Sequence, residues 1–268
     1  MFDSLKEEIK KAVNNDDVKT EALTKIHPEV NCYMNSVNVF VGRQGAGKCV
    51  QAITEIIKIS RVHKPTHMLI YVSKYGTQSD KTFESMKHLI KIPIEYVKYD
   101  DAVQEFSKIQ CFKRLYEQIK AEHLEDKISS EQREEIFETL HISDFNAPAL
   151  HTLILLDDVA NNPLIASKHG RGDAGFFSEM LGVCRHIHCS FFLTIQFWKS
   201  ITTEIKANAS TIYIFGGYSK QQLSVMLYQI PTHYSFEEIY DVYRQLQKHD
   251  CLIIDVNTGE IKIQPKEM

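Results

Sequence analysis

The fold of this 268-residue chain is decided by one stretch, Gly42-Arg43-Gln44-Gly45-Ala46-Gly47-Lys48-Cys49-Val50. Its first eight residues match the Walker A pattern G-x-x-x-x-G-K-[ST] at every position except the last. Glycines let the backbone turn tightly and direct successive N–H groups at phosphates, and a helix that follows adds its positive N-terminal end. We therefore predict that residues 42–50 bind a nucleotide and that Lys48 reaches its β- and γ-phosphates.

The segments on either side of this loop have the strand and helix that the motif requires. Asn35–Val41 is rich in Val and Phe, and Lys48–Ser60 has apolar residues at helical spacing. Further apolar runs typical of buried strands are His67–Ser73, Ile94–Val97, Leu153–Leu156, Ser190–Ile195 and Thr211–Phe215. Helical patterns lie between or after them, at Asp100–Glu122, Ser130–Leu140, Phe176–Cys184, Lys220–Tyr228 and Phe236–Gln247.

This alternation predicts the fold class. Strands that are apolar throughout and alternate with helices indicate an α/β protein whose mainly parallel sheet is covered by helices on both faces. Cys251–Val256 and Glu260–Gln264, joined by Asn257-Thr258-Gly259, predict a C-terminal β-hairpin. With the loop at residues 42–50, the pattern is that of a P-loop NTPase of the RecA-like (ASCE) type.

Composition limits the class of protein further. The chain is 43% hydrophobic and 25% charged, and no run approaches the roughly 18 apolar residues of a membrane span. Met1–Lys11 is charged and lacks an apolar signal-peptide core, and the six cysteines form neither a CxxC pair nor a zinc-binding spacing. We expect a protein of a reducing compartment, with a helical extension over residues 1–34 and one domain over residues 35–268. The formal charge of −4 neither indicates nor excludes nucleic acid.

Cys49 departs from the Walker A pattern. The usual Ser or Thr offers a hydroxyl oxygen to Mg²⁺, for which a thiol is a poor ligand. Three interpretations stay open: weaker Mg²⁺ binding, a water molecule in place of the hydroxyl, or impaired turnover. We expect nucleotide binding to be retained, with Cys49 and Asp157 as the protein's candidate metal ligands.

Polar side chains end two of the predicted strands. Leu153–Leu156 runs into Asp157 and Asp158, as in a Walker B strand, where Asp157 would hold Mg²⁺ through its water shell and Asp158 would act as general base. A surface turn with two acids is the simpler alternative. Gln196 follows Ser190–Ile195, and in a doubly wound sheet such strand ends lie at the ligand crevice. Its amide is either a sensor of the γ-phosphate or an ordinary loop residue.

These motifs, together with Arg185-His186 before the strand that closes in Gln196, resemble the FtsK/HerA superfamily. Within it the chain is similar to the genome-packaging ATPases of large nucleocytoplasmic DNA viruses and virophages, including the poxvirus enzyme. The similarity covers residues 35–220; Cys49, and Asp158 where many relatives carry Glu, depart from the family pattern. The resemblance implies a hydrolase that uses ATP and Mg²⁺ to move double-stranded DNA through a homo-oligomeric ring, a hexamer or pentamer.

The resemblance also implies roles for the basic residues, protein partners and a location in the infected cell. Arg185 would be an arginine finger that stabilises charge on the nucleotide of the neighbouring subunit. From the residues alone it could equally cap the preceding helix, and Arg171 is a rival for the finger. The loop with Lys168, His169 and Arg171 is the candidate DNA contact, or else a solvated loop. Capsid or portal proteins would be partners, in the host cytoplasm (viral factory) or the virion.

Two other functions remain as alternatives to DNA packaging. A nucleotide or small-molecule kinase would need an acceptor pocket and a lid, for which the polar region Asp100–Leu140 is available. A nucleotide-binding scaffold or switch that hydrolyses slowly is supported by Cys49. A GTPase is disfavoured, because no Asn-Lys-x-Asp guanine-reading motif occurs.

Overall fold

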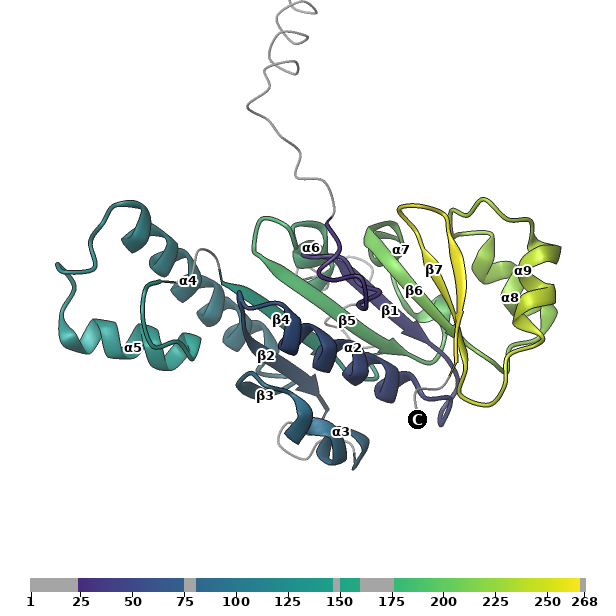
Figure 1. Ribbon diagram of the computed structural model, residues 1–268, viewed down its shortest axis with the longest axis horizontal. Helices are drawn as coiled ribbons and strands as arrows, with labels where there is room; N and C mark the ends of the chain where they lie inside the picture. Colours follow the sequence, from purple (N-terminus) through teal and green to yellow (C-terminus); the bar gives the residue numbers. More distant parts are fainter. Residues whose placement is uncertain (1–23, 75–80, 147–149, 160–175, 266–268) are drawn as a thin grey trace, which may run out of the picture.

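A single sheet organises the computed structural model, which describes residues 24–74, 81–146, 150–159 and 176–265 (Figure 1). The eight strands lie in the order β3-β2-β4-β5-β1-β6-β7-β8. Neighbours from β3 to β6 pair in parallel, whereas β7 and β8 add in antiparallel orientation. The strands are β1 (Val37–Val41), β2 (Thr66–Ser73), β3 (Ile94–Lys98), β4 (His151–Leu156), β5 (Cys189–Ile195), β6 (Ala209–Phe215), β7 (Cys251–Asp255) and β8 (Ile261–Gln264).

Helices cover both faces of this sheet. One face packs against α2 (Lys48–Val62) and α3 (Lys81–Met86), through residues such as Ile53, Ile56 and Phe83. The other face packs against a longer series of helices: α4 (Ala102–Ala121), α5 (Ser130–Leu140), α6 (Phe176–Gly182), α7 (Thr203–Asn208), α8 (Lys220–Leu227) and α9 (Phe236–Tyr243). Because both faces are covered, β1, β2, β4, β5 and β6 are buried along their whole lengths. The predicted fold class, including the terminal hairpin, is confirmed.

The helices α4 and α5 form a projecting pair at one end of the molecule (Figure 1). A capping box at Ser129 starts α5, and α4 returns from the end of β3 toward the amino ends of the strands. There the buried Lys113 Nζ donates to the carbonyl oxygens of Ile187 and His188, 2.7 and 3.2 Å away. This places α5 and the second half of α4 at the amino edge of the sheet.

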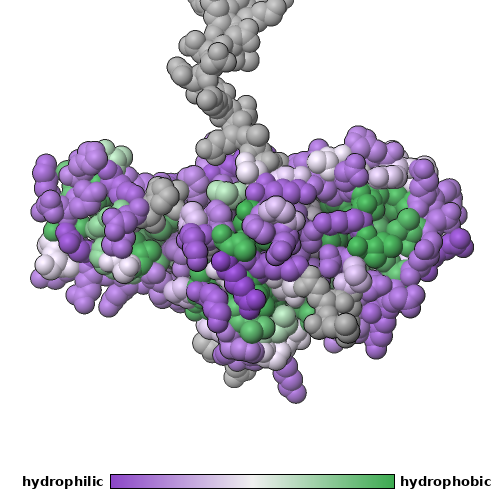
Figure 2. Space-filling view, in the orientation of Figure 1, coloured by the Kyte–Doolittle hydropathy of each residue, from purple (hydrophilic) through white to green (hydrophobic). Residues whose placement is uncertain are grey.

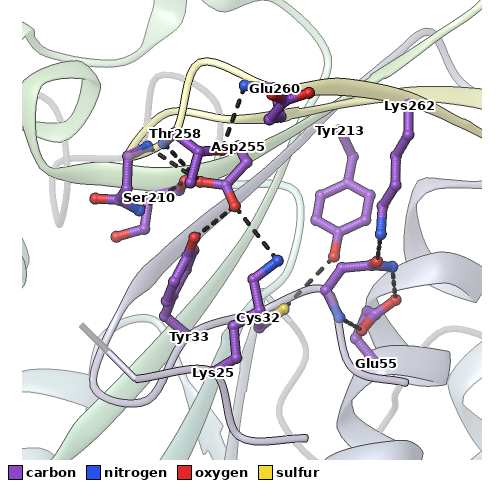
Figure 3. A network of polar contacts seen from close by, with 12 residues as sticks. Lys25, Cys32, Tyr33, Glu55, Ser210, Tyr213, Asp255, Thr258, Glu260 and Lys262 are labelled. Atoms are coloured by element: carbon purple, nitrogen blue, oxygen red, sulfur yellow. Dashed lines mark hydrogen bonds and ion pairs between the residues drawn. The ribbon is translucent and has the colours of Figure 1, made fainter. Parts of the chain in front are cut away.

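Residues 24–34 lie across the first face of the sheet, beside the C-terminal hairpin (Figure 3). Tyr33 Oη donates to Asp255 Oδ2 at 2.5 Å, and Lys25 Nζ lies 3.5 Å from the same oxygen. Asn31 donates from its backbone N–H and its side chain to Glu55 of α2, at 3.1 and 2.8 Å. Residues 1–23 of the predicted helical extension lie outside the described residues, so its helix and its boundary at residue 34 stay predictions.

No helix within the described ranges has both the length and the apolar character needed to cross a membrane.

Candidate nucleotide-binding site

The loop between β1 and α2 has the backbone geometry of a phosphate-binding loop. Gly45 and Gly47 adopt left-handed conformations, with φ of 73° and 107°, which residues with a side chain rarely take. Gly42 cannot be replaced by a residue with a side chain without a clash, because a Cβ atom there would lie 2.8 Å from Cβ of Phe215 in β6. Strand, loop and helix therefore follow in the order that the motif requires.

Lys48 opens α2 inside this loop. Its side chain is buried, and Nζ donates to the carbonyl oxygen of Arg43 at 3.1 Å. A cavity of about 460 Å³ lies against the loop, a size typical of small-ligand pockets. Its lining residues come from the loop, α2, α3 and the turn before β7: Gln44, Gly45, Gly47, Lys48, Cys49, Val50, Gln51, Thr54, Thr82 and His249.

Asp157 lies directly beside the loop, although 108 residues separate it from Cys49. The Cys49 thiol donates to its Oδ1 at 3.4 Å, and the Thr194 hydroxyl donates to the same oxygen at 2.8 Å. Tyr71 of β2 donates to Oδ2 at 3.0 Å. Three neighbouring elements, β2, β5 and α2, thus fix the orientation of this carboxylate.

Asp158 is exposed and has a left-handed backbone, with φ of 48°. Its N–H donates to Thr194 Oγ1 at 2.7 Å, and Gln196 Nε2 donates to both of its carboxylate oxygens at 3.1 Å each. The predicted pair of acids and the predicted glutamine therefore meet at the carboxyl edge of the sheet. Since Thr194 contacts both acids, it fixes them relative to each other.

Four residues of this site were missed in the sequence analysis: Tyr71, Tyr99, Thr194 and His249. Tyr99 donates its hydroxyl to the carbonyl oxygen of Asp157; burial, and then the charges of Asp157 and Asp158, raise its pKa. His249 Nδ1 lies 3.3 Å from the carbonyl oxygen of Ala46. Hydroxyls near the ends of otherwise apolar strands were the available signal for Tyr71 and Thr194, whereas nothing in the local sequence marks His249.

Of the candidate basic residues, the structure describes Arg185, which is not at this cluster. Arg185 is exposed and precedes β5, so it lies at the amino edge, opposite the loop of its own chain. Within the described ranges its guanidinium makes no hydrogen bond or ion pair, and it lies beyond the last turn of α6. Lys168, His169 and Arg171 lie outside the described residues.

The residues present fit a nucleotide better than they fit Mg²⁺. Left-handed glycines and the start of a 15-residue helix suit phosphate oxygens. Asp157 suits a hard cation, but the sulfur of Cys49 occupies the place of the usual hydroxyl and does not. Among the described residues, no three His, Cys, Asp or Glu side chains converge as a metal site.

A phosphate loop after the central strand, beside an acid-ended strand in a mainly parallel sheet, defines the P-loop NTPase fold. Among solved structures the chain is similar to the genome packaging NTPase B204 from Sulfolobus turreted icosahedral virus 2 in complex with ATP-gammaS. The TM-score is 0.51 at 18% identity, over 87% of this chain and 98% of that one.

In two other similar structures the match covers only part of the solved chain. The pCW3 conjugation coupling protein TcpA matches with a TM-score of 0.53 at 14% identity, over 85% of this chain and 60% of that one. The cytoplasmic domain of the Thermomonospora curvata type VII secretion ATPase EccC matches with a TM-score of 0.52 at 14% identity, over 85% and 25%. No family model and no curated protein sequence matches the chain. The resemblance to packaging ATPases is thus confirmed at the level of the fold.

Proposed function

We propose that this chain is an ATP-driven translocase of double-stranded DNA that packages a viral genome into its capsid. The observation that carries the proposal is the meeting of Lys48, Asp157, Asp158 and Gln196 at one edge of the sheet, beside the glycine loop. The fold supports it further, because a genome packaging NTPase aligns with this chain over 98% of its own length.

In this proposal, residues 42–50 bind ATP through backbone amides, and Lys48 exchanges the carbonyl of Arg43 for a phosphate oxygen. Asp158 accepts a proton from the attacking water. Gln196 donates through Nε2 to Asp158, so the carbonyl oxygen of its amide remains to orient that water. Thr194 and Tyr71 position the Asp157 carboxylate toward the phosphate side. A divalent cation, when bound, would neutralise phosphate charge.

The proposal extends to a ring of identical subunits, with six or five copies. Arg185 lies at the sheet edge opposite its own phosphate loop, so it is available only to another subunit's nucleotide. Its exposure and its lack of partners within the described part of the chain support the finger over the helix cap. Double-stranded DNA would be contacted by Lys168, His169 and Arg171, with capsid or portal proteins as further partners in the host cytoplasm or the virion.

The two alternatives are less well supported. A kinase lid formed by Asp100–Leu140 would have to cover the loop, yet α5 and the second half of α4 lie at the amino edge. Cys49 remains the one feature that supports a nucleotide-binding switch with slow hydrolysis. Both alternatives predict ATPase activity that is indifferent to DNA.

The test is the ATPase rate of the full chain with and without linear duplex DNA. We expect DNA to stimulate the rate, Lys48→Ala to abolish it, and the exposed-lysine control Lys64→Ala to behave like the wild type. A rate that responds to a small phosphate acceptor but not to DNA would contradict the proposal. Mixed rings test the finger: Arg185→Ala subunits combined with Lys48→Ala subunits should recover part of the activity that each variant lacks alone.

A further inference from the structure

We infer that the cation site of this chain is selective for thiophilic divalent ions such as Co²⁺ and Zn²⁺ over Mg²⁺, through direct ligation by Cys49. The inference rests on the proposed function, because the same site must bind ATP. It arises from the disagreement between the donor atoms at the loop and the ion that such loops ordinarily take.

The geometry of the pair suits ligation of one ion. Cys49 Sγ and Asp157 Oδ1 are 3.4 Å apart. With bond lengths of about 2.3 Å to sulfur and about 2.1 Å to oxygen, an ion between them would subtend an angle of about 100°, near the tetrahedral angle that Zn²⁺ prefers. The two atoms therefore need little movement to share a cation.

The surroundings hold the pair in place. Thr194 and Tyr71 donate to the two oxygens of Asp157, and Tyr99 donates to its backbone carbonyl. Cys49 lies in the first turn of α2 and lines the cavity against the loop, half-exposed. The pair supplies two ligands, and phosphate oxygens and water would complete the set, so binding of such an ion is expected to depend on ATP.

The other thiols differ from Cys49 in a way that provides a control. Burial raises the pKa of the Cys32, Cys184, Cys189 and Cys251 thiols, which keeps them protonated and poor metal ligands. Cys111 is exposed on α4 and lies outside the nucleotide cavity. Cys111→Ser is therefore the matched variant for Cys49→Ser.

The experiment measures ATP binding to the full chain by calorimetry with Mg²⁺, Co²⁺ or Cd²⁺, for the wild type, Cys49→Ser, Cys49→Thr and Cys111→Ser. The wild type and Cys111→Ser should prefer Co²⁺ over Mg²⁺ for ATP binding by at least about tenfold, and the Cys49 variants should lose that preference. A sulfur-to-metal charge-transfer absorption should appear with Co²⁺ or Cd²⁺ only when ATP is present, as the metal displaces the thiol proton to solvent. It should be absent from both Cys49 variants.

Two results would overturn the inference, and they separate it from the proposed function. ATP binding with equal metal preference in the wild type and both Cys49 variants would refute sulfur ligation and leave the ATPase proposal standing. Failure of the wild type to bind ATP with any of the three ions would refute both. Two replacements of Cys49 are used because they differ in shape but both lack the sulfur. If one of them folds poorly, the other still tests the ligation.

Discussion

Two aspartates lie at strand ends, Asp157 after β4 and Asp255 at the end of β7. Both carboxylates accept a tyrosine hydroxyl, but they differ in whether a cation and backbone N–H groups also contact them. Each accepts a tyrosine hydroxyl, from Tyr71 at 3.0 Å and from Tyr33 at 2.5 Å. Asp255 also has the ammonium of Lys25 at 3.5 Å and two backbone N–H donors within its own hairpin turn (Figure 3). Asp157 has only hydroxyl and thiol donors among the hydrogen bonds and ion pairs of the described residues.

The difference separates a structural acid from one available for chemistry. A carboxylate that already has a cation and backbone donors stabilises its surroundings and has little capacity for a further ligand. A carboxylate held only by neutral donors beside a phosphate loop is oriented but not neutralised, so it can take a metal ion. We expect substitutions at the two places to affect different quantities.

The largest effect on turnover is expected from a substitution of Asp158, the acid that faces solvent. Asp158→Asn removes the proposed base and keeps the shape, so turnover should fall by about 10²- to 10⁴-fold. ATP affinity and the melting temperature should stay close to those of the wild type, because Asp158 is exposed. Steady-state ATPase assays with ATP titration measure turnover and the response to ATP concentration, and thermal unfolding measures the melting temperature. A variant with normal turnover would exclude Asp158 from the mechanism.

Thr194→Val should have the next largest effect. The substitution keeps the shape but removes the hydroxyl that contacts both Asp157 and the N–H of Asp158. We expect turnover to fall by about 10- to 100-fold, as for other residues that orient metal-site ligands. Thr211→Val in β6 is the matched control, because the buried Thr211 hydroxyl has no hydrogen-bond partner within the described residues. Equal losses in both variants would contradict the positioning role.

Asp255→Asn should affect stability instead of turnover. The variant weakens the contacts to Tyr33, Lys25 and the hairpin turn, at an expected cost of about 1–3 kcal/mol in the free energy of unfolding. Turnover per folded molecule should not change. Urea unfolding followed alongside ATPase activity separates the two quantities, and a loss of turnover without a loss of stability would contradict a structural role for Asp255.

The smallest effect is a pH dependence of the free energy of unfolding between pH 7 and pH 5.5, caused by a buried histidine at the amino edge of the sheet. Burial, and then the charge of Lys113, lower the pKa of His67 from 6.5 to about 3. The unfolded chain therefore takes up a proton below about pH 6.5 that the folded chain excludes until about pH 3. The free energy of unfolding should fall with acid across this window, by up to about 1.4 kcal/mol per pH unit.

Unfolding at pH 7 and pH 5.5 measures this dependence. His67→Phe should reduce the slope without abolishing it, because burial also lowers the pKa of His151. An unchanged slope in His67→Phe would mean that His67 does not contribute to the acid sensitivity.

Local patterns predicted most of the fold, because its strands are buried on both faces and its helices have clear spacing. Ser130–Leu140 was predicted with the bounds that α5 has, and β2 differs from its prediction by one residue. The short helices α3 and α7 were not given bounds, since six residues contain too few turns for periodicity. The proximity of the phosphate loop to Asp157 followed from the parallel sheet, because the loop follows β1 and the acid follows β4. Asp158 and Gln196 meet for the same reason, since they follow β4 and β5.

What could not be predicted depends on tertiary contacts. The hydroxyls of Thr194 and Tyr71 stand out in their apolar strands, but only the sheet order β2-β4-β5 shows that both reach Asp157. His249 reaches Ala46 because β7 pairs with β6 in antiparallel orientation, which no local pattern encodes. Likewise, Arg185 could be assigned to the amino edge of the sheet only once the direction of β5 in the sheet was known.

The most direct test of the account is a crystal structure of the chain with a non-hydrolysable ATP analogue and Co²⁺, located by its anomalous scattering. We predict β- and γ-phosphates against the amides of residues 42–49 with Lys48 Nζ in contact, and the ion between Asp157 and those phosphates. A nucleotide bound elsewhere, or phosphates at the loop with Asp157 and Asp158 turned away from them, would contradict the account.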